Sequence, residues 1–450
     1  MGQEIEALAQ YVATARWEDV RTAVQHRTKL VLLDTLGVIL AGARCQDVQA
    51  LRERSACTTA GTGATVLAPG WPQTDPRVAA MLNALAGRAI EMSEGLRGLQ
   101  SGVHIVPAVL AVGECRKSTG RQMLEAVLFG YEVAGRLSKG FTPRALSHPN
   151  GQISLLAAVA ATSRLYGLDA KGLSRAMRIA TTALMTPSYT STAAGGTALN
   201  LPTGMSGVVA AHAPEMALAG YCAQDDAIEE ALGKLVGEKF EATDLTEDLG
   251  ESWQILDGYF RFYACCNPIY PALDSLQDVL AVLKPKPEDI ERIDVETFAF
   301  ATNMCRQDPI NYFASKYSFP HAAATLIVRR GLNFSKLDES ALNDPMISEL
   351  RHKIYMTEDP SMTALGPRLK PARVKVTLTD GRQAAAECEN CKRDSQRTDP
   401  EPQVREKFRE LAGTILPSEG VHQIERAVDR CEDWTGVDEL LVLLRRHAPN

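Results

Sequence analysis

The feature that most constrains how this chain folds is a change in its hydrophobic periodicity near residue 283. Up to about residue 260, apolar residues recur at helical spacing between turn signals, and small residues are frequent. The sequence Lys-Pro-Lys-Pro at 284–287 breaks this pattern, and apolar and polar residues then alternate with the period of a β-strand. We therefore predict a mainly α protein, with a large multihelical domain followed by a smaller α+β domain.

Local signals place several helices of the first domain. Val24, Thr28 and Val31 lie on one long N-terminal helix. Asp75 followed by Pro76 has the form of a helix start, with the aspartate as the cap and the proline in the first helical position. Further helices are expected in the segments rich in Ala, Gly and Ser, which are 119–138, 152–166, 168–184 and 204–219. Small side chains let helix axes approach closely, so these segments predict a tightly packed core.

Period-two alternation predicts the strands of the second domain. It occurs at 293–298 and again at 372–379. The pair Asp380-Gly381 follows the second of these strands and is typical of a two-residue hairpin turn, here leading into 383–389.

Helical spacing returns near the C-terminus, at 403–413 and 421–446, after a polar and Pro-rich stretch. We expect this part of the chain to pack back on the helical domain. The predicted domains are therefore a multihelical domain of residues 1–268, completed by 402–450, and an α+β lid domain of residues 269–401.

Charge and composition exclude several classes of function. The 450-residue chain has a formal net charge of −7 and no cluster of Lys and Arg, so nucleic acid is not an expected partner. No uninterrupted apolar run of about 18 residues occurs, and the first ten residues contain two Glu where a signal peptide needs positive charge. Ten cysteines in a chain of this size are not the framework of a small secreted protein. We expect a cytoplasmic protein with reduced thiols and no membrane partner.

Cys388 and Cys391 have the spacing of half a metal knuckle or of a redox pair. No second pair of Cys or His at matching spacing is present, so we interpret them as two ordinary thiols and expect no metal site. The sequence also contains no Gly-rich phosphate loop, no G-x-S-x-G elbow and no H-E-x-x-H motif.

Five segments, taken in their order and spacing, carry a resemblance that covers almost the whole chain. They are 33–42, 148–151, 220–227, 265–274 and 314–318. Together they resemble the MmgE/PrpD family, whose members include 2-methylcitrate dehydratase, cis-aconitate decarboxylase and iminodisuccinate epimerase. The resemblance implies a helical domain with a smaller α+β lid, a homodimer, and a site in the cleft between the domains that uses no cofactor. The implied substrate is a small-molecule carboxylate.

The resemblance implies an acidic residue and a His after the third helix. At these positions the chain has Glu91 and Gln100, and His104 lies about one helical turn further on. His104 is a candidate to replace the missing His, and its alternative interpretation is a core residue. Glu91 and Gln100 are candidates for substrate binding, and the alternative for Glu91 is a solvated helix face.

His148 occupies the position where the family has a His before an Ala-rich helix, with Asn150 in place of the common Thr. An imidazole takes up and releases protons near pH 7, and the N-terminus of a helix favours an anionic substrate. We therefore predict His148 as a catalytic acid or base, with capping of the following helix as the alternative. Asn150 is a candidate for substrate binding.

Downstream, the chain departs from the family pattern. The resemblance aligns Leu199 and Pro202 with a Lys and a His of the family, and it aligns Asn267 with an Arg. Arg261 replaces a second Lys and keeps the charge, although a guanidinium cannot serve as a base. Tyr270 replaces a second His and is a candidate acid or hydrogen-bond donor. We expect Arg261 to bind a substrate carboxylate.

Tyr312 and Lys316 complete the candidate substrate-binding set. Tyr312 lies where some relatives contribute a Tyr to the cleft, and Lys316 is at a family position whose alternative role is structural.

The chain lacks several cationic and His residues of the family pattern, and this changes the substrate that we expect. Each buried carboxylate without a cationic or hydrogen-bonded partner costs several kcal/mol, so a tricarboxylate is not expected. The leading hypothesis is a lyase that dehydrates or decarboxylates a small organic acid by proton abstraction next to a carboxylate. The alternatives are an isomerase or epimerase in the same cleft, a biosynthetic enzyme that uses the fold for another reaction, and a non-catalytic homologue.

Overall fold

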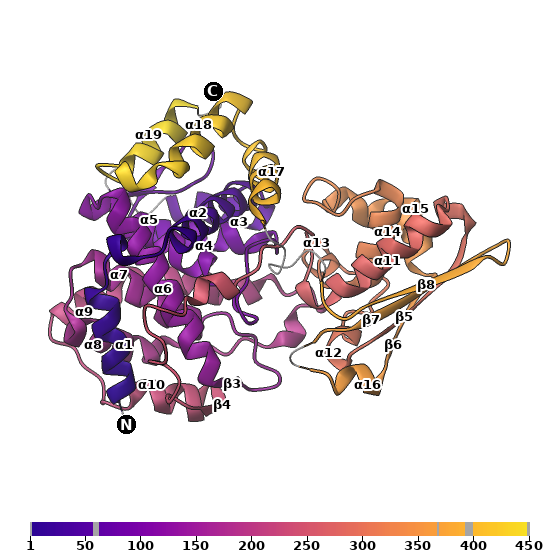
Figure 1. The fold of residues 1–450 in the computed structure, drawn as a ribbon. Coiled ribbons are helices and arrows are strands. Elements are labelled where there is room, and N and C mark those ends of the chain that lie inside the picture. The colour runs from indigo at the N-terminus through magenta and orange to yellow at the C-terminus, as the bar shows by residue number, and fades with distance from the viewer. Residues whose placement is uncertain (1, 57–62, 367–368, 392–398, 448–450) are drawn as a thin grey trace. The chain divides into compact units, whose positions relative to one another are not determined.

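The structure, a computed structural model of the chain, describes residues 2–56, 63–366, 369–391 and 399–447. They form two compact units (Figure 1). Unit 1 comprises Met1–Tyr189, Leu199–Phe260 and Pro400–Asn450, and unit 2 comprises Thr190–Ala198 and Arg261–Asp399. This division differs from the predicted domains in three segments, because 190–198 and 261–268 belong to unit 2 and 400–401 belong to unit 1.

Unit 1 is built from helices. Their bounds are α1 Gln3–Thr14, α2 Thr22–Gly42, α3 Gln46–Ala56, α4 Pro76–Ala89, α5 Gly102–Arg116, α6 Gly120–Gly140, α7 Ile153–Leu165, α8 Ala170–Ala180, α9 Leu201–Leu218, α10 Ala227–Glu230, α17 Glu401–Ala412, α18 Ser418–Asp429 and α19 Asp438–Arg446. Two short antiparallel pairs accompany them, β1 Ala64–Thr65 with β2 Gln73–Thr74 and β3 Phe141–Pro143 with β4 Gly237–Phe240. In the described part of the chain, no helix combines the length and apolar character that a membrane crossing requires.

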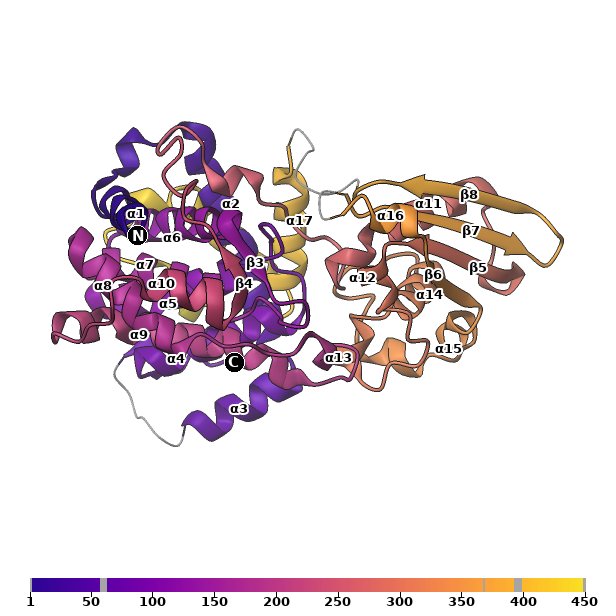
Figure 2. The ribbon, with the colours of Figure 1, turned by 90° about the horizontal axis from the view of Figure 1, so that it is seen from below.

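The local signals in the sequence explain these helices. Asp75 caps α4 by accepting a hydrogen bond from the Arg77 N–H, as predicted. Helix α7 is buried on almost every side and packs against α5, α6 and α9 (Figure 2). A Cβ at Gly130 of α6 would lie 2.9 Å from the Cβ of Ala161 on α7, so only a glycine permits this close approach. The prediction of close packing through small residues is confirmed.

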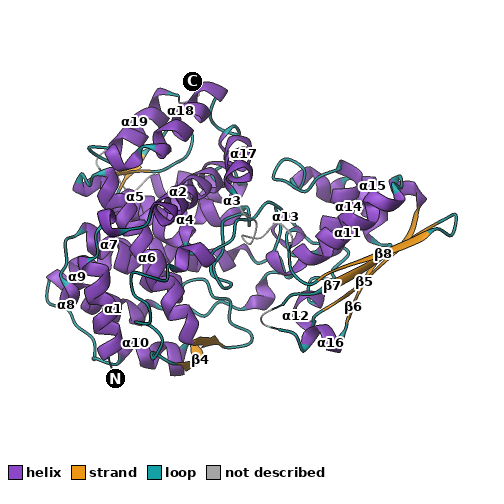
Figure 3. Ribbon diagram, viewed as in Figure 1, coloured by secondary structure: helices purple, strands orange, loops and turns teal. Residues whose placement is uncertain are grey.

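Unit 2 contains a four-stranded mixed sheet with the order β6-β5-β7-β8 (Figure 3). Its strands are β5 Ile290–Thr297, β6 Ile354–Glu358, β7 Ala372–Leu378 and β8 Gln383–Cys388. Its helices are α11 Tyr270–Leu283, α12 Ala299–Thr302, α13 Tyr312–Ser315, α14 Phe319–Arg329, α15 Pro345–Arg351 and α16 Pro360–Thr363. Strands β7 and β8 form the predicted hairpin, whose turn places Gly381 at a φ of 86°. Strand β6, which pairs in parallel with β5, was not predicted from the sequence.

The C-terminal helices belong to unit 1, and α17 packs against α2. The helical pattern at 421–446 is divided, because α18 ends at Asp429 and α19 begins at Asp438. The backbone between α18 and α19 forms hydrogen bonds with the segment at the start of α6. The Trp434 carbonyl accepts from the Gly120 N–H at 2.9 Å, and the Val437 N–H donates to the Ser118 carbonyl at 3.0 Å.

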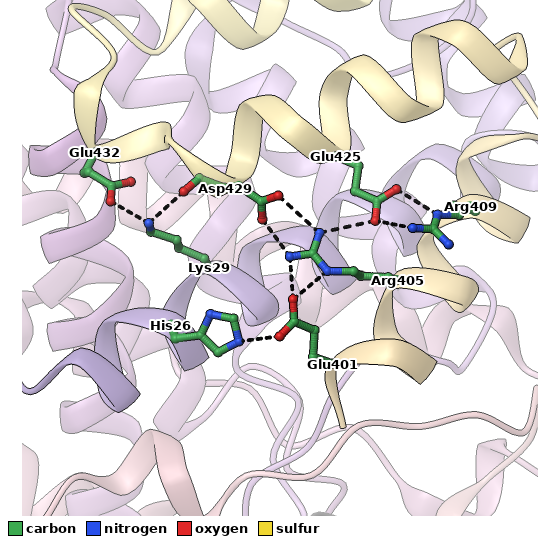
Figure 4. A network of polar contacts seen from close by, with 8 residues as sticks. All are labelled: His26, Lys29, Glu401, Arg405, Arg409, Glu425, Asp429 and Glu432. Carbon is green, nitrogen blue, oxygen red and sulfur yellow. Dashed lines mark hydrogen bonds and ion pairs between the residues drawn. The ribbon is translucent and has the colours of Figure 1, made fainter. Parts of the chain in front are cut away.

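A network of ion pairs joins α2, α17 and α18 at the surface of unit 1 (Figure 4). Arg405 lies at its centre and pairs with Glu401, Glu425 and Asp429. Arg409 adds a second contact to Glu425. Partly exposed pairs of this kind contribute about 0–1 kcal/mol each, so the network mainly fixes the orientation of these helices.

A buried ion pair lies beneath this network. The Lys407 ammonium of α17 is 2.6 Å from the Asp34 carboxylate of α2, and both side chains are at most 4% exposed. Burial raises the pKa of Asp34 above its ordinary value, although Lys407 acts in the opposite direction. The Lys407 ammonium also donates to the Met92 carbonyl, so one side chain connects α17, α2 and the turn after α4.

Removal of one member of this buried pair should destabilise the protein strongly. We expect Lys407→Met to lower the free energy of unfolding by about 3–5 kcal/mol, because the Asp34 carboxylate then lies buried without its cation. The double variant Asp34→Asn, Lys407→Met should recover part of this loss. Urea denaturation followed by circular dichroism at pH 7 measures both.

Arg409→Met, which removes a half-exposed cation from the same helix, is the matched control and should lower the free energy of unfolding by less than about 1 kcal/mol. An equal loss in the two single variants would contradict this assignment.

Candidate functional site

The turn after α4 carries Glu91 in the left-handed region, with a φ of 56°. This conformation costs a residue with a Cβ about 1–2 kcal/mol. Two contacts offset the cost. The Arg88 guanidinium forms an ion pair with the Glu91 carboxylate, with the two residues 1% and 3% exposed. The neighbouring Met92 carbonyl is held by Lys407. Glu91 is therefore a buried, paired carboxylate and does not lie on a solvated helix face.

Gln100 and His104 lie beside this ion pair. The Gln100 amide nitrogen donates to Glu91 Oε1 at 3.2 Å, and His104 Nδ1 lies 2.8 Å from the Gln100 carbonyl. A carbonyl only accepts, so His104 Nδ1 carries the hydrogen and Nε2 presents its lone pair. Burial lowers the pKa of His104 to about 4. The Arg88 guanidinium also lowers this pKa, whereas the hydrogen bond to the Gln100 carbonyl raises it. His104 is thus a neutral imidazole with an accepting Nε2.

Glu94 has a structural position in the same turn. Its Oε1 accepts from the Gly102 N–H at 2.5 Å, at the first turn of α5, and its Oε2 accepts from the Tyr131 hydroxyl. The Glu94 N–H donates to Asp34 Oδ2 at 3.2 Å. A Cβ at residue 102 would lie 2.6 Å from Glu94 Oε1, so glycine is required there. Glu94 therefore fixes the start of the helix that carries His104.

His148 lies in the loop before α7 and is 6% exposed. Its ring stacks on the Tyr189 ring at 4.8 Å between centroids. The loop is fixed by backbone bonds from the His148 N–H to the Pro187 carbonyl and from the Tyr189 N–H to the Leu146 carbonyl, both at 2.8 Å. Because His148 Nδ1 accepts from the Asn150 N–H at 3.2 Å, the hydrogen of the neutral ring is on Nε2. His148 does not cap α7, whose N-cap is Gln152.

Three buried polar atoms of these predicted residues make no hydrogen bond within the described part of the chain. They are Gln100 Oε1, His104 Nε2 and Asn150 Nδ2. A buried polar atom without a partner costs about 1–3 kcal/mol, so such atoms are retained for a reason other than stability. Ser101 and Ser154 connect the segments that carry them, because their hydroxyls lie 3.3 Å apart.

Tyr270 begins α11 in unit 2 and is 1% exposed. Its hydroxyl donates to the backbone carbonyls of Tyr263 and Cys265, at 2.7 and 3.1 Å. The phenolic hydrogen is thus directed to the backbone of the loop that follows Arg261. In this arrangement Tyr270 fixes the path of the chain after Arg261, which is itself 4% exposed.

Lys316 is brought to the same loop. Its carbonyl accepts from the Cys266 N–H at 2.8 Å, and its ammonium lies 3.8 Å from the centre of the Tyr312 ring. Lys370 also reaches this loop, with its ammonium 2.7 Å from Asn267 Oδ1. Lys316 and Lys370 therefore both contact the loop of residues 261–267, Lys316 through its backbone carbonyl and Lys370 through its ammonium.

Arg88, Lys370 and His321 were not among the residues predicted from the sequence. The spacing of Arg88 three residues before Glu91 is a readable signal for an ion pair. Lys370 lies in a loop far from Asn267 in sequence, and nothing in the pattern indicates their contact. His321 of α14 is fully buried, and burial lowers its pKa to about 4. The Nδ1 atom of His321 lies 3.4 Å from the Arg351 guanidinium, so we interpret His321 as a structural residue of the interior.

The remaining residues noted in the sequence show no feature of a binding or catalytic site. Leu199 and Pro202 are buried apolar residues, so the structure places no charge at either position. Cys388 is buried and Cys391 is half-buried, and the Cys388 thiol donates to the Asn390 carbonyl at 2.6 Å. Among the residues that the structure describes, no group of three His, Cys, Asp or Glu side chains is arranged as a metal ligand set.

Comparisons with known proteins match both halves of the chain. The model of the MmgE/PrpD N-terminal domain matches residues 6–237, and that of the MmgE/PrpD C-terminal domain matches 263–433. A cis-aconitate decarboxylase from Aspergillus terreus is 22% identical over 95% of this chain and 93% of its own length. The cis-aconitate decarboxylase of Homo sapiens is 24% identical over 95% and 91%. The cis-aconitate decarboxylase-like protein oryM of Aspergillus oryzae is 24% identical over 98% and 97%.

His104 should remain neutral well below pH 6. In a histidine NMR titration, with the signal assigned through a His104→Gln variant, we expect a ring protonated on Nδ1 that gains charge only near its pKa of about 4. His352 is the internal reference, because its hydrogen bond to Asp308 raises its pKa above 6.5. Since the folded-state pKa of His104 is lowered, its contribution to stability is complete above pH 6.5 and is lost as the pH falls toward 4. A His104 signal that titrates near 6.5 would contradict this description.

Proposed function

The chain belongs to the MmgE/PrpD family, and from this membership we propose that it is a cofactor-independent lyase that removes water or carbon dioxide from a small organic acid. The relatives named cis-aconitate decarboxylase support a lyase of this kind. The observation that carries the proposal concerns the predicted site residues of unit 1, where three buried polar atoms make no hydrogen bond within the described part of the chain, namely Gln100 Oε1, His104 Nε2 and Asn150 Nδ2. We also propose, from the resemblance, that the active form is a cytoplasmic homodimer.

The two imidazoles differ in their proton positions, and this difference supports a division of roles. His104 Nε2 is an acceptor, because its Nδ1 donates to the Gln100 carbonyl. His148 Nε2 carries the hydrogen of the neutral ring, because its Nδ1 accepts from the Asn150 N–H. We assign His148 as the group that exchanges a proton with the substrate, and His104 as the neutral acceptor that orients a substrate hydroxyl or protonated carboxyl. The side chains of Gln100 and Asn150 bind polar groups of the substrate.

Unit 2 supplies the charges that would bind carboxylates. Arg261 is the proposed clamp, since a guanidinium matches a carboxylate with two parallel hydrogen bonds. Lys316 and Lys370 lie at the same loop and add to its positive charge, and Tyr312 supports Lys316. Tyr270 positions the loop and is not the proposed acid, because its hydroxyl donates to backbone carbonyls.

The proposed substrate carries fewer than three carboxylates. Arg88 is already paired with the Glu91 carboxylate, so it adds no net charge for an anion. The apolar side chains of Leu199 and Pro202 leave two further positions without a charge. Lys370 partly compensates for the missing positive charge, because its ammonium lies beside Asn267. A monocarboxylate or dicarboxylate fits this balance better than a tricarboxylate.

An isomerase is the second candidate, and one observation favours it. An accepting imidazole and a donating imidazole in one unit are suited to removing a proton and returning one. In deuterated water, an isomerase would incorporate deuterium into recovered substrate without net release of water or carbon dioxide. A lyase would release one of these in proportion to product.

The first test is turnover by a His148→Ala variant. With the purified full chain, product formation from cis-aconitate and from unsaturated mono- and dicarboxylates is followed by NMR and carbon dioxide release. We expect activity on the less charged acids, and a reduction of kcat by about 10² to 10⁴ in His148→Ala because an acid–base group is lost. His212→Ala, which changes a half-exposed His of α9, is the control and should keep full activity. An unchanged rate in His148→Ala would remove this residue from the mechanism.

The second test concerns the clamp. We expect Arg261→Met to raise KM by about tenfold to a hundredfold, because a charge-assisted hydrogen bond to a carboxylate contributes about 1.5–3 kcal/mol. Arg261→Lys should show a smaller increase, since it keeps the charge but not the paired geometry. Arg292→Met, on the exposed face of β5 in the same unit, is the matched control. If Arg261→Met lowered kcat alone with KM unchanged, the clamp assignment would be wrong.

A further inference from the structure

Unit 2 contains a cavity of about 710 Å³ that none of the candidate site residues lines. It lies at the C-terminal ends of α11 and α14 and along the segment 331–336 that follows α14. Its volume is within the range of about 300–1,000 Å³ that small-molecule sites occupy.

Among the residues that the structure describes, three cations and no carboxylate line this cavity. They are Lys284, Arg330 and Lys336. No ion pair of these three side chains occurs within the described residues, although the neighbouring Arg329 pairs with both Asp338 and Asp344. The available carboxylates thus neutralise the arginine beside the cavity, and the cavity itself retains positive charge.

The rest of the lining is largely apolar and includes Leu280, Leu326 and Leu332. Leu332 is 3% exposed and Leu326 is 8% exposed, so the apolar surface belongs to the interior of unit 2. We propose that this cavity is a binding site for a small amphipathic anion, whose phosphate or carboxylate head contacts the three cations and whose apolar body lies against the leucines.

Helix capping alone does not account for these cations. Lys284 and Arg330 follow the last residues of α11 and α14 in the left-handed conformation, where a cation also complements the helix dipole. Lys117 has the same position after α5 and needs no ligand to explain it. Lys336, however, lies in the turn after Asn333, outside any helix, and its convergence with the other two is explained by an anion.

Calorimetric titration of the full chain tests the proposal with hexyl phosphate, which has an anionic head and an apolar body. Inorganic phosphate and hexanol test each part alone. We expect saturable binding of one hexyl phosphate, at least about tenfold tighter than either part, and a roughly tenfold loss in each of Lys284→Gln, Arg330→Gln and Lys336→Gln. Lys375→Gln, an exposed cation of β7, is the control and should bind like the wild type.

A second pair of variants separates occupancy of the cavity from general surface charge. Ala281 is an exposed residue of α11 that lines the cavity, whereas its neighbour Val282 is 73% exposed and does not line it. Ala281→Trp should abolish hexyl phosphate binding by filling the space, and Val282→Trp should leave it unchanged. The proposal is overturned if hexyl phosphate binds no tighter than inorganic phosphate, or if Ala281→Trp binds it as the wild type does.

Discussion

The buried contact between Lys407 and Asp34 is the interaction on which the candidate site depends most. These residues are 373 positions apart in sequence, and their 2.6 Å contact joins α17 to the long helix α2. Lys407 also holds the Met92 carbonyl, and Asp34 accepts from the Glu94 N–H. The turn that places Glu91 in a left-handed conformation is therefore held on both sides by one ion pair. The C-terminal segment thereby serves to fix the geometry of the site.

Burial, rather than residue type alone, sets the protonation of this site. His104 has the ordinary chemistry of a physiological switch, yet desolvation lowers its pKa to about 4 and keeps it neutral. The Arg88–Glu91 pair adds no net charge but contributes a guanidinium that disfavours the imidazolium. The same surroundings fix which ring nitrogen carries the hydrogen. A His in a familiar position therefore does not imply a familiar role, because its partners determine whether it accepts or donates.

The sequence predicts those parts of the structure that local chemistry determines. Asp75 with Pro76 and Asp380 with Gly381 specify their helix start and hairpin through short-range hydrogen bonds and backbone geometry. Features that depend on distant partners were missed. The break after Asp429 arises because the following segment bonds to the start of α6, and Lys370 reaches Asn267 from more than a hundred residues away. Strand β6 has little alternation in its burial, so its pairing with β5 left no clear periodic signal.

The candidate residues of the two units differ in their chemistry. In unit 1, the available groups at Gln100, His104 and Asn150 are neutral, and the nearby charges of Arg88 and Glu91 cancel. In unit 2, the loop after Phe260 contains Arg261, accepts a hydrogen bond from the Lys370 ammonium through Asn267, and bonds to the backbone of Lys316. We infer that neutral groups suit proton transfer because they need no compensating charge, whereas cations suit the binding of carboxylates. Under the proposed function, replacements in the neutral set would change proton transfer, and replacements in the cationic set would change the charge of the substrate that binds.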